Sequence, residues 1–137
     1  MRYCNHLPHK ILRINMINLN KIINRLGKYL NKHIDGAYDY YTESNTSIVK
    51  FLVYYQIKQI PDQPGGEYDY SDLKEIDFEI NITTYQDFIR INILEISPNE
   101  TTIGYLKYDS GNIVFGDILS DIQKKIRRRF EGYEFLF

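Results

Sequence analysis

The spacing of the apolar residues changes twice along this chain, and these two changes constrain the fold more than any other feature. Apolar side chains recur every third or fourth residue near the start, every second residue in the middle, and every third or fourth residue again near the end. The first spacing is typical of an amphipathic helix and the second of a strand with one buried face. With 137 residues the chain has the length of one domain. The order helix, strands, helix therefore describes a single α+β domain.

The first helix is predicted from one apolar stripe that begins after Asn18. Its members lie at helical spacing: Leu19, Ile22, Ile23, Leu26 and Leu30. Asn18 is a suitable N-cap and Gly36 a suitable residue just beyond the C-terminus of this helix. Residues 1–15 are expected to be an N-terminal extension, disordered or foreign to the native protein, so the single α+β domain is assigned to residues 16–137.

Four strands are predicted from alternating apolar residues in the middle of the chain, and a short fifth strand from its position after a turn. The expected segments are residues 49–57, 76–82, 89–93, 101–108 and, for the fifth, 112–115. Two prolines and a glycine pair predict a long loop over residues 61–72, and the polar stretch 39–47 is expected to be an irregular connection. Gly111 is expected in the left-handed region of a three-residue turn.

Short connections favour an antiparallel meander, and a sheet with one apolar face needs a covering layer. A second amphipathic helix is predicted to open at Gly116 and Asp117. The apolar residues at helical spacing around it are Phe115, Leu119, Ile122, Ile126, Phe130 and Tyr133. The predicted fold is a two-layer α+β sandwich with a four- or five-stranded antiparallel sheet between an N-terminal and a C-terminal helix. On its outer face Lys50 and Lys58 are expected to pair with Asp77 and Glu79. Arg90 is expected to pair with the same acids. The apolar end, residues 133–137, is expected to pack on the core or on a partner.

Charge is distributed unevenly although the net charge is only −1. Residues 1–33 contain seven Lys or Arg and no acid, whereas residues 34–105 contain thirteen acids and four bases. The basic faces of the two helices carry Lys21, Arg25, Lys28 and Lys32 in the first and Lys124, Lys125, Arg127, Arg128 and Arg129 in the second. Such faces suit a nucleic-acid phosphate backbone, although bases near a helix C-terminus also stabilise any helix.

Two tyrosine-rich acidic segments are candidates for protein recognition. Their residues are Tyr38, Asp39, Tyr40 and Tyr41 in the first, and Tyr68, Asp69, Tyr70 and Asp72 in the second. Tyrosine provides a rigid contact area at low entropic cost, so we expect these segments to bind a partner with a basic surface.

Catalytic and metal-binding patterns are absent from the sequence. Cys4, His6 and His9 are three potential ligands near the N-terminus, but a zinc site needs four at suitable spacing, so we predict no metal site and no cofactor. A single cysteine excludes an intramolecular disulfide. No apolar run is long enough to cross a membrane, so a soluble, intracellular protein without membrane insertion is expected.

Two functions remain open from the sequence. The first is a non-catalytic protein interaction or assembly module, acting on another protein or on a second copy through the basic helical face and the acidic tyrosine-rich segments. The alternative is a nucleic-acid-binding protein that uses the basic faces of both helices. Abundant Ile, Asn, Lys and Tyr suggest an AT-rich genome, which fits a viral, bacterial or organellar accessory protein.

Overall fold

A computed structural model of the chain describes residues 7–59, 61, 63–67, 69–70, 72–130 and 133–136. Its elements in chain order are α1 (Leu7–His33), β1 (Ala37–Glu43), β2 (Thr46–Gln59), β3 (Asp69–Tyr70), β4 (Lys74–Thr84), β5 (Phe88–Ser97), β6 (Thr101–Asp109), α2 (Phe115–Arg129) and β7 (Tyr133–Leu136). The predicted α+β class, with an antiparallel sheet between two helices, is confirmed.

The sheet is antiparallel throughout and follows the order β1-β2-β4-β5-β6, with β3 and β7 pairing to β2 outside this path. The longest strand, β2, pairs with β4 along one edge. Its other edge is shared: β1 pairs with residues 46–51 and β7 with residues 54–57. The apolar end of the chain therefore packs as an additional strand of the sheet.

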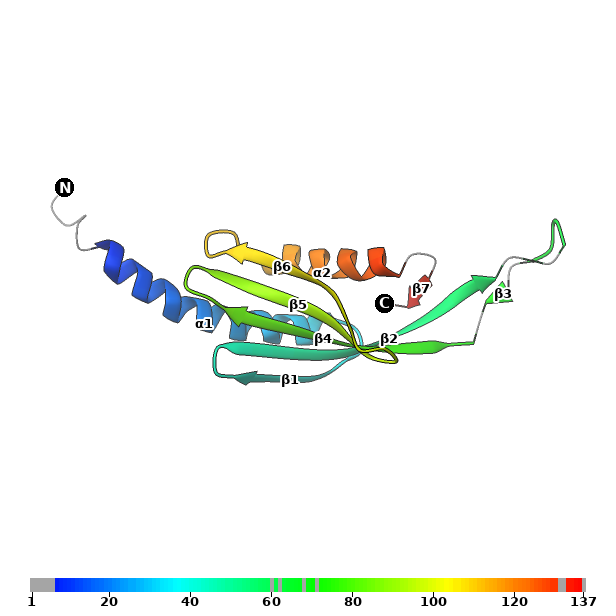
Figure 1. Ribbon diagram of the computed structural model, residues 1–137, viewed down its shortest axis with the longest axis horizontal. Coiled ribbons are helices and arrows are strands. Elements are labelled where there is room, and N and C mark those ends of the chain that lie inside the picture. Colours follow the sequence, from blue (N-terminus) through cyan, green and yellow to red (C-terminus); the bar gives the residue numbers. More distant parts are fainter. Residues whose placement is uncertain are drawn as a thin grey trace.

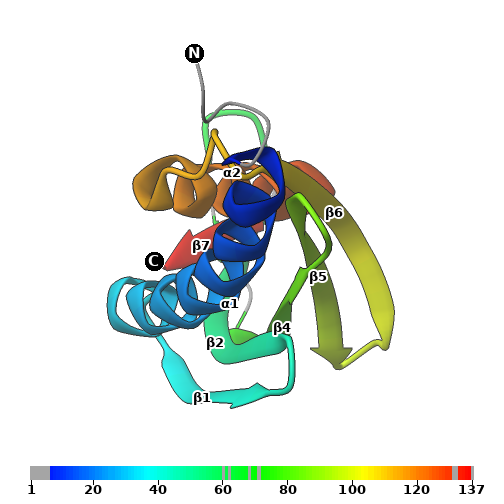
Figure 2. The ribbon, with the colours of Figure 1, turned by 90° about the vertical axis from the view of Figure 1, so that its left-hand side faces the viewer.

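Both helices cover the same, concave face of the sheet (Figure 2). Helix α1 contacts β1, β2, β4 and β5, while α2 lies mainly against β6. The inner residues of β2, β4 and β5 are buried between these layers, and Phe51 and Phe78 stack with ring centroids 5.2 Å apart. Strict alternation of buried and less buried residues along β4 shows that one sheet face alone supplies the core.

Three local predictions differ from the structure. Helix α1 begins at Leu7, so Asn18 lies inside the helix and is not its N-cap; an asparagine costs a helix interior only a fraction of a kcal/mol. The stretch expected to be irregular forms β1, and its inward side chains are small or aromatic rather than aliphatic, which hides the alternation. Residues 112–114 form no strand, because the chain leads directly into α2.

The turn before α2 also differs from the prediction. The amide of Asn112 donates to the carbonyl of Asp109 at 2.9 Å, which closes the turn. Gly111 is not among the glycines with positive φ, since in the described part of the chain these are Gly36 and Gly65. The turn thus needs no left-handed residue, and residue 111 has no steric requirement for glycine.

A hairpin arm projects from one end of the molecule, away from the helices (Figure 1). We define the arm as the described residues within the range 58–73, which include the end of β2 and β3. Within it Lys58 pairs with Tyr70 and Gln59 with Asp69, so the arm continues the β2–β4 hairpin beyond the body of the sheet. Its described loop residues 63–67 are all exposed.

Gly36 joins α1 to the sheet by a close backbone approach. Its φ is +85°, and a Cβ placed there would lie 2.1 Å from the carbonyl oxygen of Leu52. The Gly36 carbonyl accepts a hydrogen bond from the Leu52 amide at 3.0 Å, so the two backbones are fixed against each other. A side chain at position 36 must push this junction apart.

We predict that Gly36→Ala destabilises the protein by about 3 kcal/mol or more, because left-handed strain and backbone overlap add. Gly65→Ala is the matched control: its φ is +81°, but nothing lies within 4 Å of the added Cβ. It should cost only about 1 kcal/mol. Urea unfolding of the two variants measures the difference, and equal losses would contradict the role of the Leu52 contact.

Candidate interaction sites

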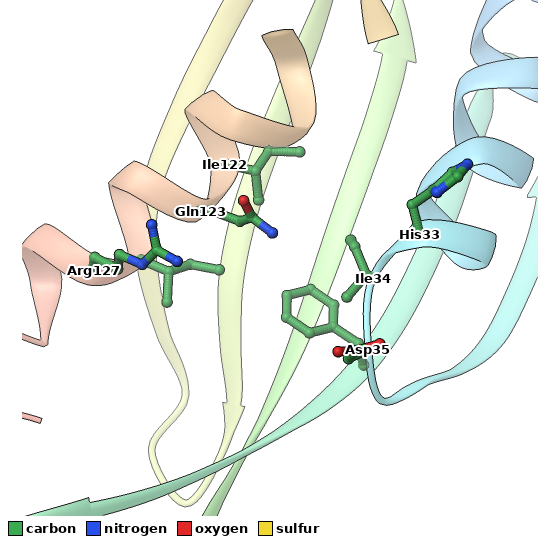
Figure 3. A pocket seen from close by; sticks show the side chains of 8 residues that line it. His33, Ile34, Asp35, Ile122, Gln123 and Arg127 are labelled. Carbon is green, nitrogen blue, oxygen red and sulfur yellow. The ribbon is translucent and has the colours of Figure 1, made fainter. Parts of the chain in front are cut away.

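A pocket of about 270 Å³ opens between the C-terminal end of α1 and the C-terminal half of α2. Its floor consists of side chains that belong to the core: Ile34, Phe51, Ile122 and Ile126. Gln123 and Arg127 extend from α2 on one side of the opening, and His33 and Asp35 lie on the other side, at the end of α1 (Figure 3). An apolar floor with a few polar groups at the mouth is the usual composition of a binding pocket.

Aromatic contacts fix the relative position of the two helices beside this pocket. The ring of Tyr29 lies 4.2 Å from that of His33 and 5.5 Å from that of Phe115, between ring centroids. Helix α2 therefore starts beside Tyr29, and its later turns continue past the end of α1, where the pocket opens.

Docking of α2 onto β6 depends on a polar contact as well. The hydroxyl of Tyr108 donates to Asp121 at 2.6 Å. Burial, and then this hydrogen bond and the nearby carboxylate charge, raise the pKa of Tyr108 well above its usual value. One turn later the alkyl part of Lys125 packs over Gly104, which has no side chain to exclude it.

The predicted basic residues of α1 form a single exposed stripe. Lys21, Arg25, Lys28 and Lys32 are all exposed, and their spacing of three or four residues places them on the helix side opposite the buried residues. Asn24 and Asn31 flank the stripe, and no acid occurs on the helix. This surface offers positive charge without aromatic or apolar contacts.

The basic residues of α2 are distributed around the exposed part of that helix. Lys125 lies over β6, Arg127 lines the pocket, and the guanidinium of Arg129 lies 5.9 Å from the ring centroid of Phe130. Lys124 and Arg128 are exposed. The structure thus brings one of the five bases, Arg127, to the pocket between the helices, and the other four do not line it.

The two tyrosine-rich acidic segments lie apart. Residues 38–41 belong to β1, which is part of the main sheet because it pairs with β2 residues 46–51. The second segment lies in the arm. In the arm, Tyr68 lies outside the described residues, Asp69 and Tyr70 form β3, and Asp72 is exposed. The segments therefore do not form one surface.

Two tyrosines of β1 have structural partners. Tyr38 remains 56% exposed, and its hydroxyl donates to the carboxylate of Asp77 at 2.8 Å. Local desolvation, followed by this hydrogen bond, raises the pKa of Tyr38 to about 12. On the other face the hydroxyl of Tyr40 reaches the backbone oxygen of Asn24 at 3.0 Å and its side-chain oxygen, and burial raises the pKa of Tyr40. Asp39 and Tyr41 are exposed.

The outer face of the sheet carries one of the expected charge pairs. Lys50 lies opposite Glu79, with 3.9 Å between Nζ and Oε1. Arg90 instead lies opposite Thr83 and stacks 4.6 Å from the ring centroid of Tyr105, so its predicted pairing with the acids of β4 is wrong. A shallow cavity of about 450 Å³ lies beside the Lys50–Glu79 pair, and its lining includes Leu94, Ile96 and three glutamates.

Searches for relatives give no assignment: no family model, curated protein or solved structure matches this chain. In the described part of the chain, no three His, Cys, Asp or Glu side chains are arranged to hold a metal ion. Cys4 and His6 of the N-terminal ligand trio lie outside the described residues. Neither described helix is both long enough and apolar enough to cross a membrane.

Sequence reasoning missed the pocket because its members come from distant positions. His33, Asp35 and Gln123 carry no motif, and Phe51 reads only as a core residue of a strand.

We predict that Tyr108→Phe lowers the free energy of unfolding by about 1 kcal/mol at neutral pH, since it removes a half-buried hydrogen bond to a carboxylate. Because the folded-state pKa of Tyr108 is raised, this contribution is complete below the ordinary tyrosine pKa. It should decline as the pH rises above about 10. Urea unfolding between about pH 7 and pH 11 measures it.

Tyr85→Phe is the control, because the Tyr85 hydroxyl makes no hydrogen bond within the described residues and its ring only stacks on Phe88. Its effect should be small at every pH. If the loss from Tyr108→Phe were the same at high and neutral pH, the proposed linkage would be wrong.

Proposed function

We propose that this protein is a non-catalytic interaction or assembly module that recognises another protein, or a second copy of itself, through surface charge and exposed apolar groups. The observation that carries the proposal is the projecting arm, which extends beyond the body of the sheet and carries exposed Glu67 and Asp72, with exposed Leu73 where the chain enters β4 (Figure 1). Residues 63–67 of the arm are all exposed, as is usual for a loop that is available to a partner.

Charge supports the same function. The described bases of α1 lie on the helical side of the molecule, and the described acids of β1 and β4 lie on strands of the sheet. Opposite charges on different parts of one surface steer protein partners and set their orientation. Exposed Leu73 in the arm and Tyr54 at its base add apolar contact area of the kind found at the centre of interfaces.

Nucleic-acid binding is the second candidate, and the α1 stripe favours it. Four exposed bases in register with no intervening acid could follow a phosphate backbone. Exposed Phe or Tyr side chains for base stacking do not accompany this stripe on α1 within the described residues. On α2, Lys125 packs over Gly104 of β6 and Arg127 lines the pocket. For these reasons we place protein recognition first.

Light scattering coupled to size-exclusion chromatography tests the proposal, at about 50 mM and 500 mM salt, on protein purified without nuclease. We expect a mass above that of the monomer at low salt, with an absorbance ratio typical of pure protein. A chain that carries nucleic acid and releases it at high salt would support the second candidate instead. In that case Arg25→Glu combined with Lys28→Glu should weaken binding to a duplex probe, with Glu43→Gln as a control.

A further inference from the structure

We propose that the protein binds a neutral sugar in a polar pocket at the end of the sheet opposite the arm (Figure 1). This pocket has a volume of about 350 Å³ and lies between α1 and two turns of the sheet. We call it the amide pocket, and its described lining residues are Asn20, Asn45, Thr84, Tyr85 and Gln86. It is separate from the arm and from the pocket between α1 and α2, so the inference goes beyond the proposed function.

Hydrogen bonds hold the helix and the two turns in fixed positions around the amide pocket. The turn between β1 and β2 supplies Asn45, and the turn between β4 and β5 supplies Tyr85 and Gln86. The two turns are joined because the amide of Thr84 donates to the carbonyl of Asn45 at 3.1 Å. The Thr84 hydroxyl, on a residue only 8% exposed, donates to Oδ1 of Asn20 at 2.7 Å and ties α1 to the same place. The pocket is therefore formed before any ligand binds, as is usual for a small-molecule site.

The amide pocket offers donors and acceptors that the chain itself does not use. Oδ1 of Asn20 is occupied by Thr84, while the side-chain N–H groups of Asn20 have no hydrogen bond within the described residues. Nδ2 of Asn45 donates to the carbonyl oxygen of Thr84 at 3.1 Å, which leaves Oδ1 of Asn45 as an acceptor. Gln86 is exposed and adds a donor and an acceptor. These groups recognise a ligand by hydrogen bonding without any formal charge.

A smaller pocket of about 160 Å³ shares Asn20 with the amide pocket. Its lining includes Ser47, which is fully buried and whose Oγ has no hydrogen-bond partner within the described residues. The hydroxyl of the neighbouring Tyr40 donates to Asn24 instead. Buried polar atoms in folded proteins normally have a partner. An unsatisfied hydroxyl in the wall of a pocket therefore points to a polar group that enters from outside the chain.

An exposed aromatic ring forms part of the wall of the amide pocket. Tyr85 is 46% exposed, and its ring stacks on that of Phe88 with centroids 4.8 Å apart and planes inclined by 13°. Because Phe88 covers one face of this ring, a ligand would pack on the opposite face. A sugar has C–H groups on the faces of its ring and hydroxyl groups around its rim. It therefore packs on a rigid tyrosine ring while its hydroxyls reach the surrounding amides.

The absence of charge in the described lining decides between classes of ligand. A phosphate or carboxylate group is bound most strongly by Lys or Arg, and no described lining residue of either pocket is charged. Four charged residues adjoin lining residues in the sequence without lining either pocket: Lys21, Arg25, Glu43 and Asp87. An apolar ligand would exclude water and leave the amides unpaired, which is unfavourable. A neutral ligand with several hydroxyl groups avoids both costs.

Two-dimensional NMR of the isotope-labelled full chain tests the proposal, because the side-chain amides of Asn and Gln give their own signals. The probes are glucose, galactose, mannose and N-acetylglucosamine, each as the free monosaccharide and as a short oligosaccharide. Uridine monophosphate is the charged comparison. Titration of each probe measures its affinity.

Four variants separate the amide pocket from the rest of the surface. Tyr85→Ala removes the ring, and Tyr85→Phe retains it. Gln86→Ala removes one exposed amide and provides a second test if Tyr85→Ala fails to fold. Tyr105→Ala is the matched control, since Tyr105 is 59% exposed on β6 and does not line the pocket.

We expect at least one sugar to shift the side-chain amide signals of Asn20 and Asn45. Tyr85→Ala should bind it at least about tenfold more weakly than the wild type, and Tyr85→Phe should bind more tightly than Tyr85→Ala. Gln86→Ala should also weaken binding, whereas Tyr105→Ala should bind like the wild type.

Binding of a monosaccharide would identify a soluble sugar as a sufficient ligand, and binding of oligosaccharides alone would identify a glycan chain. Unchanged amide signals with every sugar would show that the pocket holds only water and would overturn the proposal. Larger shifts with uridine monophosphate than with any sugar would overturn it in favour of a nucleotide. An equal loss of affinity in Tyr105→Ala and Tyr85→Ala would also contradict the assigned site.

Discussion

Burial of one sheet face is the constraint on which the rest of the structure depends. Most inward residues of β2, β4 and β5 are Ile, Val or Phe, and these are nearly inaccessible to solvent. Each such side chain contributes about 1.5–3 kcal/mol when it leaves water, so the sheet is stable only under a cover. Helices α1 and α2 supply that cover from the same side, and the pocket opens between them beside the buried Phe51.

The same constraint explains why the outer face is free for other uses. Its side chains, such as Lys50, Glu79 and Arg90, tolerate solvent and contribute little to the core. The arm is likewise not covered by the helices, because it projects beyond them (Figure 1). Stability is thus concentrated on one side of the sheet, and the groups available to a partner lie on its other side, in the arm and at the helix ends.

Sequence periodicity predicted the helices, the four long strands and most core residues, because each of these elements has one buried face with a regular repeat. It failed at β1, where the inward positions hold Ala37 and Tyr40 rather than branched aliphatic residues. It also failed at the start of α1, since Asn18 has the chemistry of a cap without being at a terminus. The pocket was beyond reach because it depends on tertiary packing between residues such as Asp35 and Gln123, which no local pattern connects.

The shared edge of β2 also bears on the order in which the sheet assembles. Strand β1 reaches this edge through a two-residue turn with Ser44 at φ +57°, whereas β7 pairs with residues roughly eighty positions earlier in the chain. Local pairing closes quickly and distant pairing slowly, so the two halves of one edge form in separate kinetic events. Until β7 arrives, residues 54–57 of β2 present an unpaired backbone edge, and premature association of nascent chains would start there.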